Sequence, residues 1–345
     1  MSVQVTAVKE HSLDVAARGT TARAILLRPI LLFLLGFLVL CAFFDGLQRA
    51  FPYLATGSEV VFQAKLRDEA RGAVFPIKTS GTKVIVFGNS SILAGLVSKH
   101  FDELARADGL ETYTYNSGFP GHVEFVPQLK AMVDTGNAPD VVLLTKAWQP
   151  KRSGGIFKLP FADQELANTI FPFRNLIRDA ASFAFTSRER GGLLRFYRKA
   201  SQNIAQMQSD QGYYFISEQS HYASERLPDD FHMADDKPNV PQFRQADPSS
   251  PELAELNSIL RAHSIKCFYV PYPARGSALG EAPPTDPAFQ QLVESHTPCK
   301  VVGPYYYRYP NRDLSDQTHL NHIGSKIYTE DLYRLVKPYL AKGDR

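Results

Sequence analysis

This chain has few cysteines, a single tryptophan and almost no net charge. Three cysteines in 345 residues exclude a disulfide-dense scaffold and a cysteine-rich zinc site. Lys and Arg number 38 against 35 Asp and Glu, so the net charge is only +3, and no basic excess is present to neutralise the phosphates of a nucleic acid. A hydrophobic share of 44% beside a charged share of 21% excludes a disordered chain. A globular protein of one or two domains remains.

One long hydrophobic run is present near the start of the chain. Residues 24–47 contain a single charge, Arg28, before Asp45. About 20 apolar residues cross the roughly 30 Å of hydrocarbon in a bilayer, so this run predicts one membrane-spanning helix. The basic residues on its N-terminal side are Lys9, Arg18, Arg23 and Arg28. The positive-inside bias therefore places residues 1–23 in the cytoplasm and the rest of the chain in the periplasm or outside the cell.

Three other interpretations fit this run less well. A cleaved signal peptide has a shorter apolar core and a small-x-small cleavage site, which does not follow closely here. A lipoprotein site at Cys41 requires a small residue where Leu40 stands. A helix buried in a soluble core does not explain the basic flank. We therefore expect an uncleaved, single-pass anchor in the cytoplasmic membrane.

Short buried strands alternate with helices after residue 80. Residues 48–80 predict a linker with a polar helix, and residues 81–345 predict one domain. Its five expected strands cover residues 83–88, 112–115, 140–145, 265–270 and 299–302. Helical spacing separates them, first over residues 92–108. The alternation predicts an α/β fold, a flavodoxin-like three-layer α/β/α sandwich with a five-stranded parallel sheet. Residues 150–250 break the alternation and predict an insertion, part helix and part loop.

A serine directly follows the first expected strand. Residues 87–91 read Phe-Gly-Asn-Ser-Ser, so Ser90 stands where the strand turns into a helix. Open α/β sheets place their ligands at this edge, and a helix N-terminus offers unpaired N–H groups to a developing oxyanion. Because Asn89 and Ser90 are also good helix caps, this segment alone fits a structural role equally well.

An aspartate and a histidine lie three residues apart before the last expected helix. On a tight turn, the carboxylate of Asp316 can hold Nδ1–H of His319 and leave Nε2 free to take a proton from a serine. The structural alternative is an aspartate cap beside a surface histidine. A second histidine, His322, follows at a spacing seen in metal sites, but two ligands do not make a site, so we expect no metal.

Together these two segments resemble the SGNH (GDSL-type) hydrolase family. The family's Gly-Asp-Ser block corresponds to Gly88-Asn89-Ser90, and its Asp-x-x-His block corresponds to Asp316 and His319. The resemblance covers residues 83–340 apart from the insertion. It implies the three-layer sandwich and a Ser-His-Asp triad in which Ser90 is the nucleophile, with no metal or organic cofactor.

The resemblance also implies an oxyanion hole built from short blocks. The N–H of Ser90 would be one donor, and a glycine N–H of the second block another; Gly121 is the better match and Gly118 the other candidate. The family's third block supplies an Asn, which is missing after the third expected strand. Either Gln149 or Trp148 donates in its place, or the hole depends on the two backbone N–H groups. A lost oxyanion donor typically costs about 10²–10³ in rate.

Further residues at these strand ends are candidates for substrate contact or pairing. The expected substrate contacts are Asn89, Asn116, Trp148 and Tyr306. The tyrosine cluster at residues 305–309 is equally consistent with stacking on sugar rings and with packing. Cys267 and Cys299 fall on neighbouring expected strands and could pair in an oxidising exterior, but two buried free thiols are the preferred interpretation.

Membrane-anchored, exported members of the family with altered middle blocks are similar to DltD-type and alginate O-acetylation proteins. This similarity implies acyl esters of a cell-surface or exported polysaccharide as substrate, with acetyl as the default group, and a membrane-bound O-acyltransferase as partner. We therefore expect an esterase or O-acyltransferase. The alternative is a non-catalytic scaffold that binds glycan or that acyltransferase. The missing third-block Asn favours the scaffold, and the intact Ser90, Asp316 and His319 oppose it.

Overall fold

The computed structural model describes most of the expected α/β domain and part of the hydrophobic run. The described residues are 28–40, 42, 58–119, 125–145, 193–215, 225–233, 236, 251–278 and 287–341. The chain divides into two compact units. The first is Met1–Leu54 with Ala162–Ala181, and the second is Ala55–Phe161 with Ser182–Arg345.

In the first unit, residues 28–40 form a helix whose large apolar side chains are exposed, from 48% for Leu34 and Phe37 to 73% for Phe33. Among the described residues, no helix combines the length and hydropathy that crossing a bilayer requires. The expected anchor at residues 24–47 extends beyond the described part of this unit at both ends. The anchor therefore stays a prediction.

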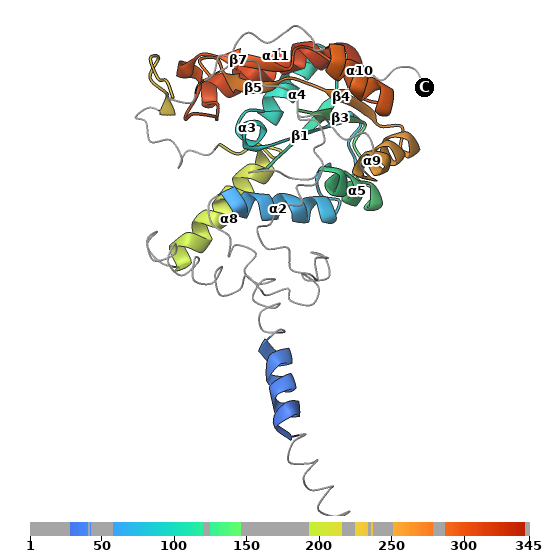
Figure 1. Ribbon diagram of the computed structural model, residues 1–345, viewed down its shortest axis with the longest axis vertical. Coiled ribbons are helices and arrows are strands. Elements are labelled where there is room, and N and C mark those ends of the chain that lie inside the picture. Colours follow the sequence, from blue (N-terminus) through green and yellow to red (C-terminus); the bar gives the residue numbers. More distant parts are fainter. Residues whose placement is uncertain are drawn as a thin grey trace, which may run out of the picture. The chain divides into compact units, whose positions relative to one another are not determined.

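A five-stranded parallel sheet forms the centre of the second unit (Figure 1). Its order is β2-β1-β3-β4-β6. The strands are β1 (Thr82–Gly88), β2 (Thr112–Gly118), β3 (Val141–Leu144), β4 (Lys266–Tyr269) and β6 (Lys300–Val301). All pairs are parallel, and Gly88 lies opposite Gly118 where β1 and β2 end. All five expected strands are confirmed.

Helices cover both faces of this sheet, which explains why β1 is apolar without alternation. Ile85 and Phe87 pack into one hydrophobic cluster, whereas Val84 and Val86 pack into another. The helices on the first face are α5 (Phe125–Asp134), α9 (Pro251–Ala262) and α10 (Pro287–His296). Those on the second face are α4 (Ser98–Ala107) and α11 (His322–Leu340). The result is a parallel sheet between two helical layers.

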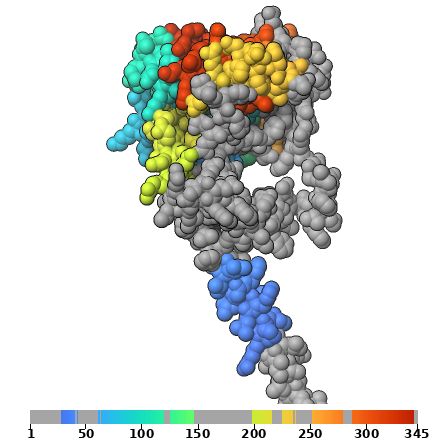
Figure 2. Space-filling model, turned by 90° about the vertical axis from the view of Figure 1, so that its left-hand side faces the viewer, coloured from blue at the N-terminus to red at the C-terminus, as the bar shows by residue number. Residues whose placement is uncertain are grey.

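Two further helices lie at the β2 side of the sheet. The linker helix α2 (Ser58–Ala70) packs against α5 and against α8 (Leu193–Ser209). Helix α8 belongs to the expected insertion, and residues 211–215 lead from it to the edge of β2. Figure 2 shows the surface where residues 193–215, in yellow-green, and residues 225–236, in yellow, lie beside the red C-terminal segment. The remainder of the insertion lies outside the described residues.

Three local predictions were wrong in their details. The expected helix over residues 92–108 is broken into α3 (Ser90–Leu93) and α4, and Gly95 lies at the break, where a Cβ would come within 2.3 Å of Ser91 O. The expected strand over residues 112–115 continues to Gly118, because Asn116 to Gly118 pair with the end of β1. A second, two-stranded parallel sheet of β5 (Tyr272–Arg275) and β7 (Tyr306–Tyr309) was not expected.

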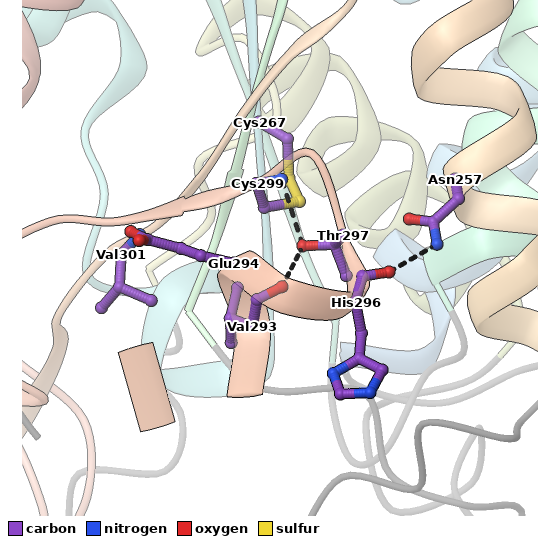
Figure 3. The surroundings of a disulfide bond; sticks show 8 residues. All are labelled: Asn257, Cys267, Val293, Glu294, His296, Thr297, Cys299 and Val301. Carbon is purple, nitrogen blue, oxygen red and sulfur yellow. Dashed lines mark hydrogen bonds between the residues drawn. A yellow bond between two sulfur atoms is a disulfide. The ribbon is translucent and has the colours of Figure 1, made fainter. Parts of the chain in front are cut away.

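The structure also corrects the preferred interpretation of the cysteines as free thiols. Cys267 of β4 and Cys299, the residue before β6, form a disulfide (Figure 3). These strands are neighbours in the sheet, so the Cα atoms lie only 4.4 Å apart. Thr297 supports the bridge, since its Oγ1 accepts from Cys299 N at 3.1 Å and donates to Val293 O at 2.9 Å.

Candidate active site

Ser90 lies at the carboxyl end of β1, as its position in the sequence predicts. It is the first residue of α3, and the side chain of Asn89 caps this short helix by accepting a hydrogen bond from Ser91 N at 3.2 Å. The turn is tight, because a Cβ on Gly88 would come within 2.3 Å of Ile92 and 2.6 Å of Thr145 Oγ1. Ser90 itself is partly exposed. A serine hydroxyl is therefore presented at the sheet edge where open α/β folds bind ligands.

Asp316 and His319 lie on a closed turn before α11. The turn follows the short helix η3 (Asn311–Asp313), and a β-bridge between Leu314 and Leu320 closes it. Asp316 Oδ1 accepts from the backbone N–H groups of Thr318 and His319, both at 2.8 Å. Asp316 Oδ2 lies 2.7 Å from His319 Nδ1. The prediction that this aspartate can hold this imidazole agrees with the geometry.

The carboxylate of Asp316 is kept ionised by this arrangement. Partial burial raises its pKa, but the hydrogen bond and charge of His319 and the two backbone donors outweigh burial, so the pKa lies below its ordinary value. An ionised acceptor at Nδ1 holds the proton there and fixes the tautomer in which Nε2 is the basic atom. A pair held in this way has the geometry that an oriented general base requires.

The other ring nitrogen of His319 has no hydrogen-bond partner among the described residues. Nε2 is buried, and no described residue forms a hydrogen bond with it. A buried polar atom without a partner costs free energy, and such atoms in native folds call for an explanation such as a catalytic role or an unseen ligand. His319 therefore offers one unused, inward-facing acceptor in a ring whose other nitrogen is fixed.

Contacts through residues 213–215 connect the Ser90 helix with the start of α11. Tyr214 N donates to Leu93 O at 3.1 Å, at the end of α3. Tyr213 OH lies 3.5 Å from His322 Nδ1 and 3.5 Å from Ser325 Oγ, both in the first turn of α11. The rings of Phe215 and His322 are 3.9 Å apart between centroids. The three aromatic residues thus touch both segments that carry the predicted triad.

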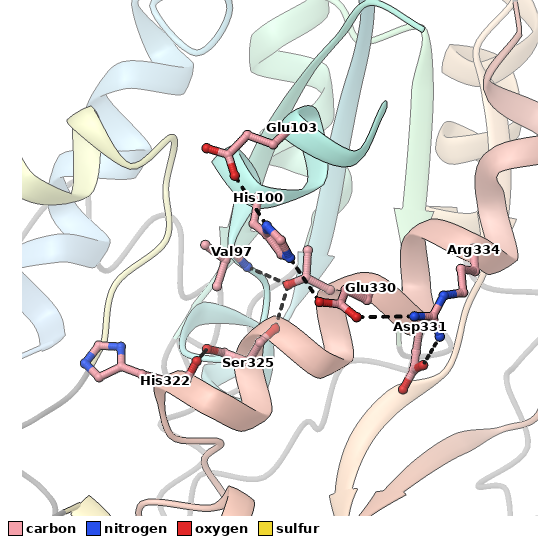
Figure 4. A network of polar contacts seen from close by, with 9 residues as sticks. Val97, His100, Glu103, His322, Ser325, Glu330, Asp331 and Arg334 are labelled. Atoms are coloured by element: carbon pink, nitrogen blue, oxygen red, sulfur yellow. Dashed lines mark hydrogen bonds and ion pairs between the residues drawn. The ribbon is translucent and has the colours of Figure 1, made fainter. Parts of the chain in front are cut away.

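A second set of contacts joins the next helix to α11 (Figure 4). Val97 N donates to Thr329 Oγ1 at 3.0 Å, and His100 Nε2 lies 3.3 Å from Glu330 Oε1. Ser90 and His319 are therefore on segments that are tied to each other. No hydrogen bond joins the two residues, because the Nε2 of His319 is unpartnered within the described part of the chain. The contact between Ser90 and His319, which the triad requires, therefore stays a prediction.

The two glycine candidates for the oxyanion hole differ in availability. Gly118 ends β2, and its N–H donates to Asn116 Oδ1 at 2.8 Å, so this donor is already used inside the fold. Gly121 lies outside the described residues, as do Trp148 and Gln149. Gly121 thus stays the candidate for the second backbone donor.

Two of the residues expected to contact substrate are buried. Asn116 is 0% exposed, and its Nδ2 donates to Ile92 O at 2.7 Å and to Leu96 O at 2.8 Å. These bonds account for Asn116 inside the fold, where it ties β2 to the residues that follow Ser90. Tyr306 is 1% exposed and packs in an aromatic cluster with Tyr272 and Tyr305. Packing against these rings explains the position of Tyr306. The side chain of Asn89 caps α3, as described above.

Sequence reasoning missed a buried pair of opposite charges next to this region. Lys65 and Glu69 of α2 are 0% and 1% exposed and contact the end of β2. They belong to a helix that looks polar in sequence, so no local signal marks them as buried. For metals, the described residues contain no group of three or more His, Cys, Asp or Glu side chains that could hold an ion.

Comparison with known proteins assigns no family. No family model matches the chain, and no curated protein matches it. Among solved structures, a gut microbial diltiazem-metabolizing enzyme (BT4096) is similar over 41% of this chain and 37% of its own, at 16% sequence identity and a TM-score of 0.14. At that TM-score the likeness supports no statement about fold or function.

Proposed function

We propose that this chain is a membrane-anchored, exported serine esterase or O-acyltransferase of the SGNH type, acting on acyl esters of a polysaccharide. The observation that carries the proposal is the oriented imidazole of His319, with Nδ1 held by Asp316 and Nε2 buried without a hydrogen-bond partner in the described part of the chain. Its support from the fold is the parallel sheet, which presents Ser90 at the edge where ligands bind.

The chemistry that these groups can perform is acyl transfer through a covalent intermediate. Ser90 Oγ attacks the acyl carbonyl while His319 Nε2 takes the hydroxyl proton. The ester C–O bond then breaks, and the imidazolium returns the proton to the departing sugar oxygen. Water or a second sugar hydroxyl next attacks the acyl group on Ser90 and gives its proton to His319. The bond between the acyl carbon and Ser90 Oγ then breaks, and the imidazolium returns this proton to Ser90 Oγ, which releases the free acid or the new ester. The N–H groups of Ser90 and Gly121 are the proposed oxyanion donors.

The location and the partners belong to the same proposal. The disulfide between Cys267 and Cys299 supports an oxidising compartment such as the periplasm or the cell exterior. The hydrophobic run at residues 24–47 supports a single-pass anchor that keeps residues 1–23 in the cytoplasm. An anchored enzyme of this kind would meet a membrane-bound O-acyltransferase and its polysaccharide on the outer face of the membrane.

The test uses a fluorophosphonate probe, which labels activated serines. The full-length protein in detergent is treated with the probe at several pH values from about 6 to about 9, the range in which general bases commonly operate. The labelled peptide is identified by mass spectrometry. We expect labelling at Ser90, hydrolysis of acetyl esters, and loss of both in Ser90→Ala. Ser91→Ala is the matched control, since Ser91 is the next residue and is 8% exposed.

Absence of labelling at Ser90 across this range, in a protein that is folded by circular dichroism, would overturn the catalytic proposal. The alternative function would then be preferred, a scaffold that binds glycan or the acyltransferase. The observation that favours it is the missing third-block Asn, since no Asn follows β3 in residues 145–150. Labelling at a different serine would move the active site and overturn the assignment of Ser90.

A further inference from the structure

Two fully buried charges lie on one face of α2, outside the predicted triad. Lys65 is 0% exposed and Glu69, one turn later, is 1% exposed. Moving a charged side chain from water into a protein interior is costly unless hydrogen bonds or an opposite charge compensate. A helix that serves only as a linker does not require buried ionisable side chains. Their contacts show which part of the molecule they serve.

Lys65 caps the free edge of the sheet at the end of β2. Its Nζ donates to Asn116 O at 2.6 Å and to Gly118 O at 2.9 Å. The ammonium also lies 5.5 Å from the ring centroid of Phe119 and 5.9 Å from that of Tyr115. Because β2 is the outermost strand, these two carbonyls have no neighbouring strand to bond. One side chain thus satisfies both of them.

Residues 116–119, at and just after the end of β2, also contact the turn that contains Ser90. Phe119 N donates to Gly88 O at 3.0 Å, two residues before Ser90. The backbone of β2 also lies directly against α3, since a Cβ on Gly118 would come within 2.3 Å of Leu93 N. The amide of Asn116 bonds to the carbonyls around the end of α3, as described above. A shift of the strand end would therefore be transmitted to the Ser90 turn.

Glu69 sets the electrostatic environment of Lys65. Its Oε1 accepts from Ser117 Oγ at 2.8 Å, and its Oε2 is buried without a partner among the described residues. Burial raises the pKa of Glu69 to about 7, against the hydrogen bond of Ser117 and the charge of Lys65. Burial also lowers the pKa of Lys65 well below its ordinary value, and the Glu69 charge opposes that shift.

Other ionisable groups near the pair lie on the elements that pack against α2. Asp68 is the neighbouring acid, and its carboxylate accepts from Gln208 Nε2 of α8 at 3.0 Å. Burial raises the pKa of Asp68, and its hydrogen bond with Gln208 and the charges of Arg67 and Arg71 oppose this. Tyr115 of β2 is a buried phenol whose ring centroid lies 5.9 Å from Lys65 Nζ. Glu69, with a pKa of about 7, changes its ionisation near neutral pH.

We propose that Lys65 is a positioning residue for the reaction at Ser90. It holds the carbonyls of Asn116 and Gly118, and through them the Ser90 turn and the start of the segment that leads to Gly121. Glu69 tunes this contact through its own protonation. The role in catalysis rests on the proposed function, whereas the role in ordering the strand end does not.

The test compares Lys65→Met, which keeps the length but removes the donor, with Lys65→Arg, which keeps a cation. Lys99→Met is the matched control, since Lys99 is half exposed and pairs with Asp210. Hydrogen exchange is measured on the full-length protein for peptides that cover residues 84–96 and 112–119, with residues 322–340 as reference. The rate of fluorophosphonate labelling of Ser90 is measured against pH for every variant.

For Lys65→Met we expect faster exchange confined to the two site peptides and labelling slowed at least about tenfold, because small displacements of reacting groups are costly in rate. Lys65→Arg should recover part of the rate, and Glu69→Gln should remove a step in the pH profile near neutrality. Wild-type exchange and labelling in a folded Lys65→Met variant would overturn the proposal, and so would a uniform rise in exchange that includes residues 322–340.

The two proposals fail separately. If wild-type Ser90 takes no label, the proposed function fails, and the exchange arm alone still decides whether Lys65 orders the Ser90 turn. If Lys65→Met does not fold, the pH profile of Glu69→Gln decides instead. A profile identical to the wild type in that variant would overturn the inference.

Discussion

Removing the disulfide between Cys267 and Cys299 should destabilise the α/β unit strongly. The bridge closes a loop with a sequence separation of 32, and the chain-entropy relation assigns a loop of this size about 4 kcal/mol of stabilisation. Both cysteines are buried, at 3% and 1% exposure, so the double substitution Cys267→Ala/Cys299→Ala also loses packing between β4, β6 and α10. We expect a fall in melting temperature on the order of 10 °C.

Thermal unfolding followed by far-ultraviolet circular dichroism, with and without a thiol reductant, is the assay. The wild type should lose stability when reductant is present during heating, whereas the double variant should not respond. Cys41→Ala is the control, because this third cysteine lies outside the pair and its variant should keep the full response to reductant. A wild-type melting temperature that is the same with and without reductant would refute the reasoning. Three titratable thiols in the unfolded, unreduced chain would also refute it, because the disulfide leaves only Cys41 as a free thiol.

Two further predictions concern ionisable groups. Asp316→Asn removes the charge that orients His319, so labelling and ester hydrolysis at Ser90 should fall on the order of 10²–10⁴-fold without loss of folding; an unchanged rate would show that this aspartate does not serve the base. Glu69 has a pKa of about 7 in the folded chain against an ordinary value of 4.5, so the native state holds this proton more tightly than the unfolded state does. Its contribution to the free energy of unfolding is complete below about pH 4.5 and is lost as the pH rises through 7, by up to about 3 kcal/mol. Denaturant titrations should show this fall flattened in Glu69→Gln and retained in Glu103→Gln, an exposed control; equal slopes in all three proteins would contradict the burial of an ionisable Glu69.

Much of the fold could be predicted from local patterns. The strands β1, β3 and β4 are short apolar runs, and helices of ordinary length separate the strands, so their order along the chain already implies a parallel sheet. The Asp316–His319 contact was also predictable, because residues three apart on a tight turn meet without help from the rest of the chain.

The details that failed depend on neighbours distant in sequence. The end of β2 looks like a glycine-rich turn, yet Lys65 and Gln211 bond its outer edge and β1 bonds its inner edge, so the strand continues to Gly118. The helix after Ser90 breaks at Gly95, where the chain packs closely, although its helical spacing is continuous. Pairing of Cys267 with Cys299 required strands separated by α10 to become neighbours in the sheet.

By itself, then, the sequence determined the order of the five strands of the main sheet along the chain and which aspartate can hold which histidine, because those outcomes follow from periodicity and from contacts within one turn. Only the tertiary structure decided that Lys65 and Glu69 are buried and that the Asn116 side chain bonds inside the fold. It also decided that His319 Nε2 is buried with no partner among the described residues. Burial and hydrogen bonding depend on segments that folding brings together. The identity of a polar residue in the sequence does not indicate which distant residues will pack against it.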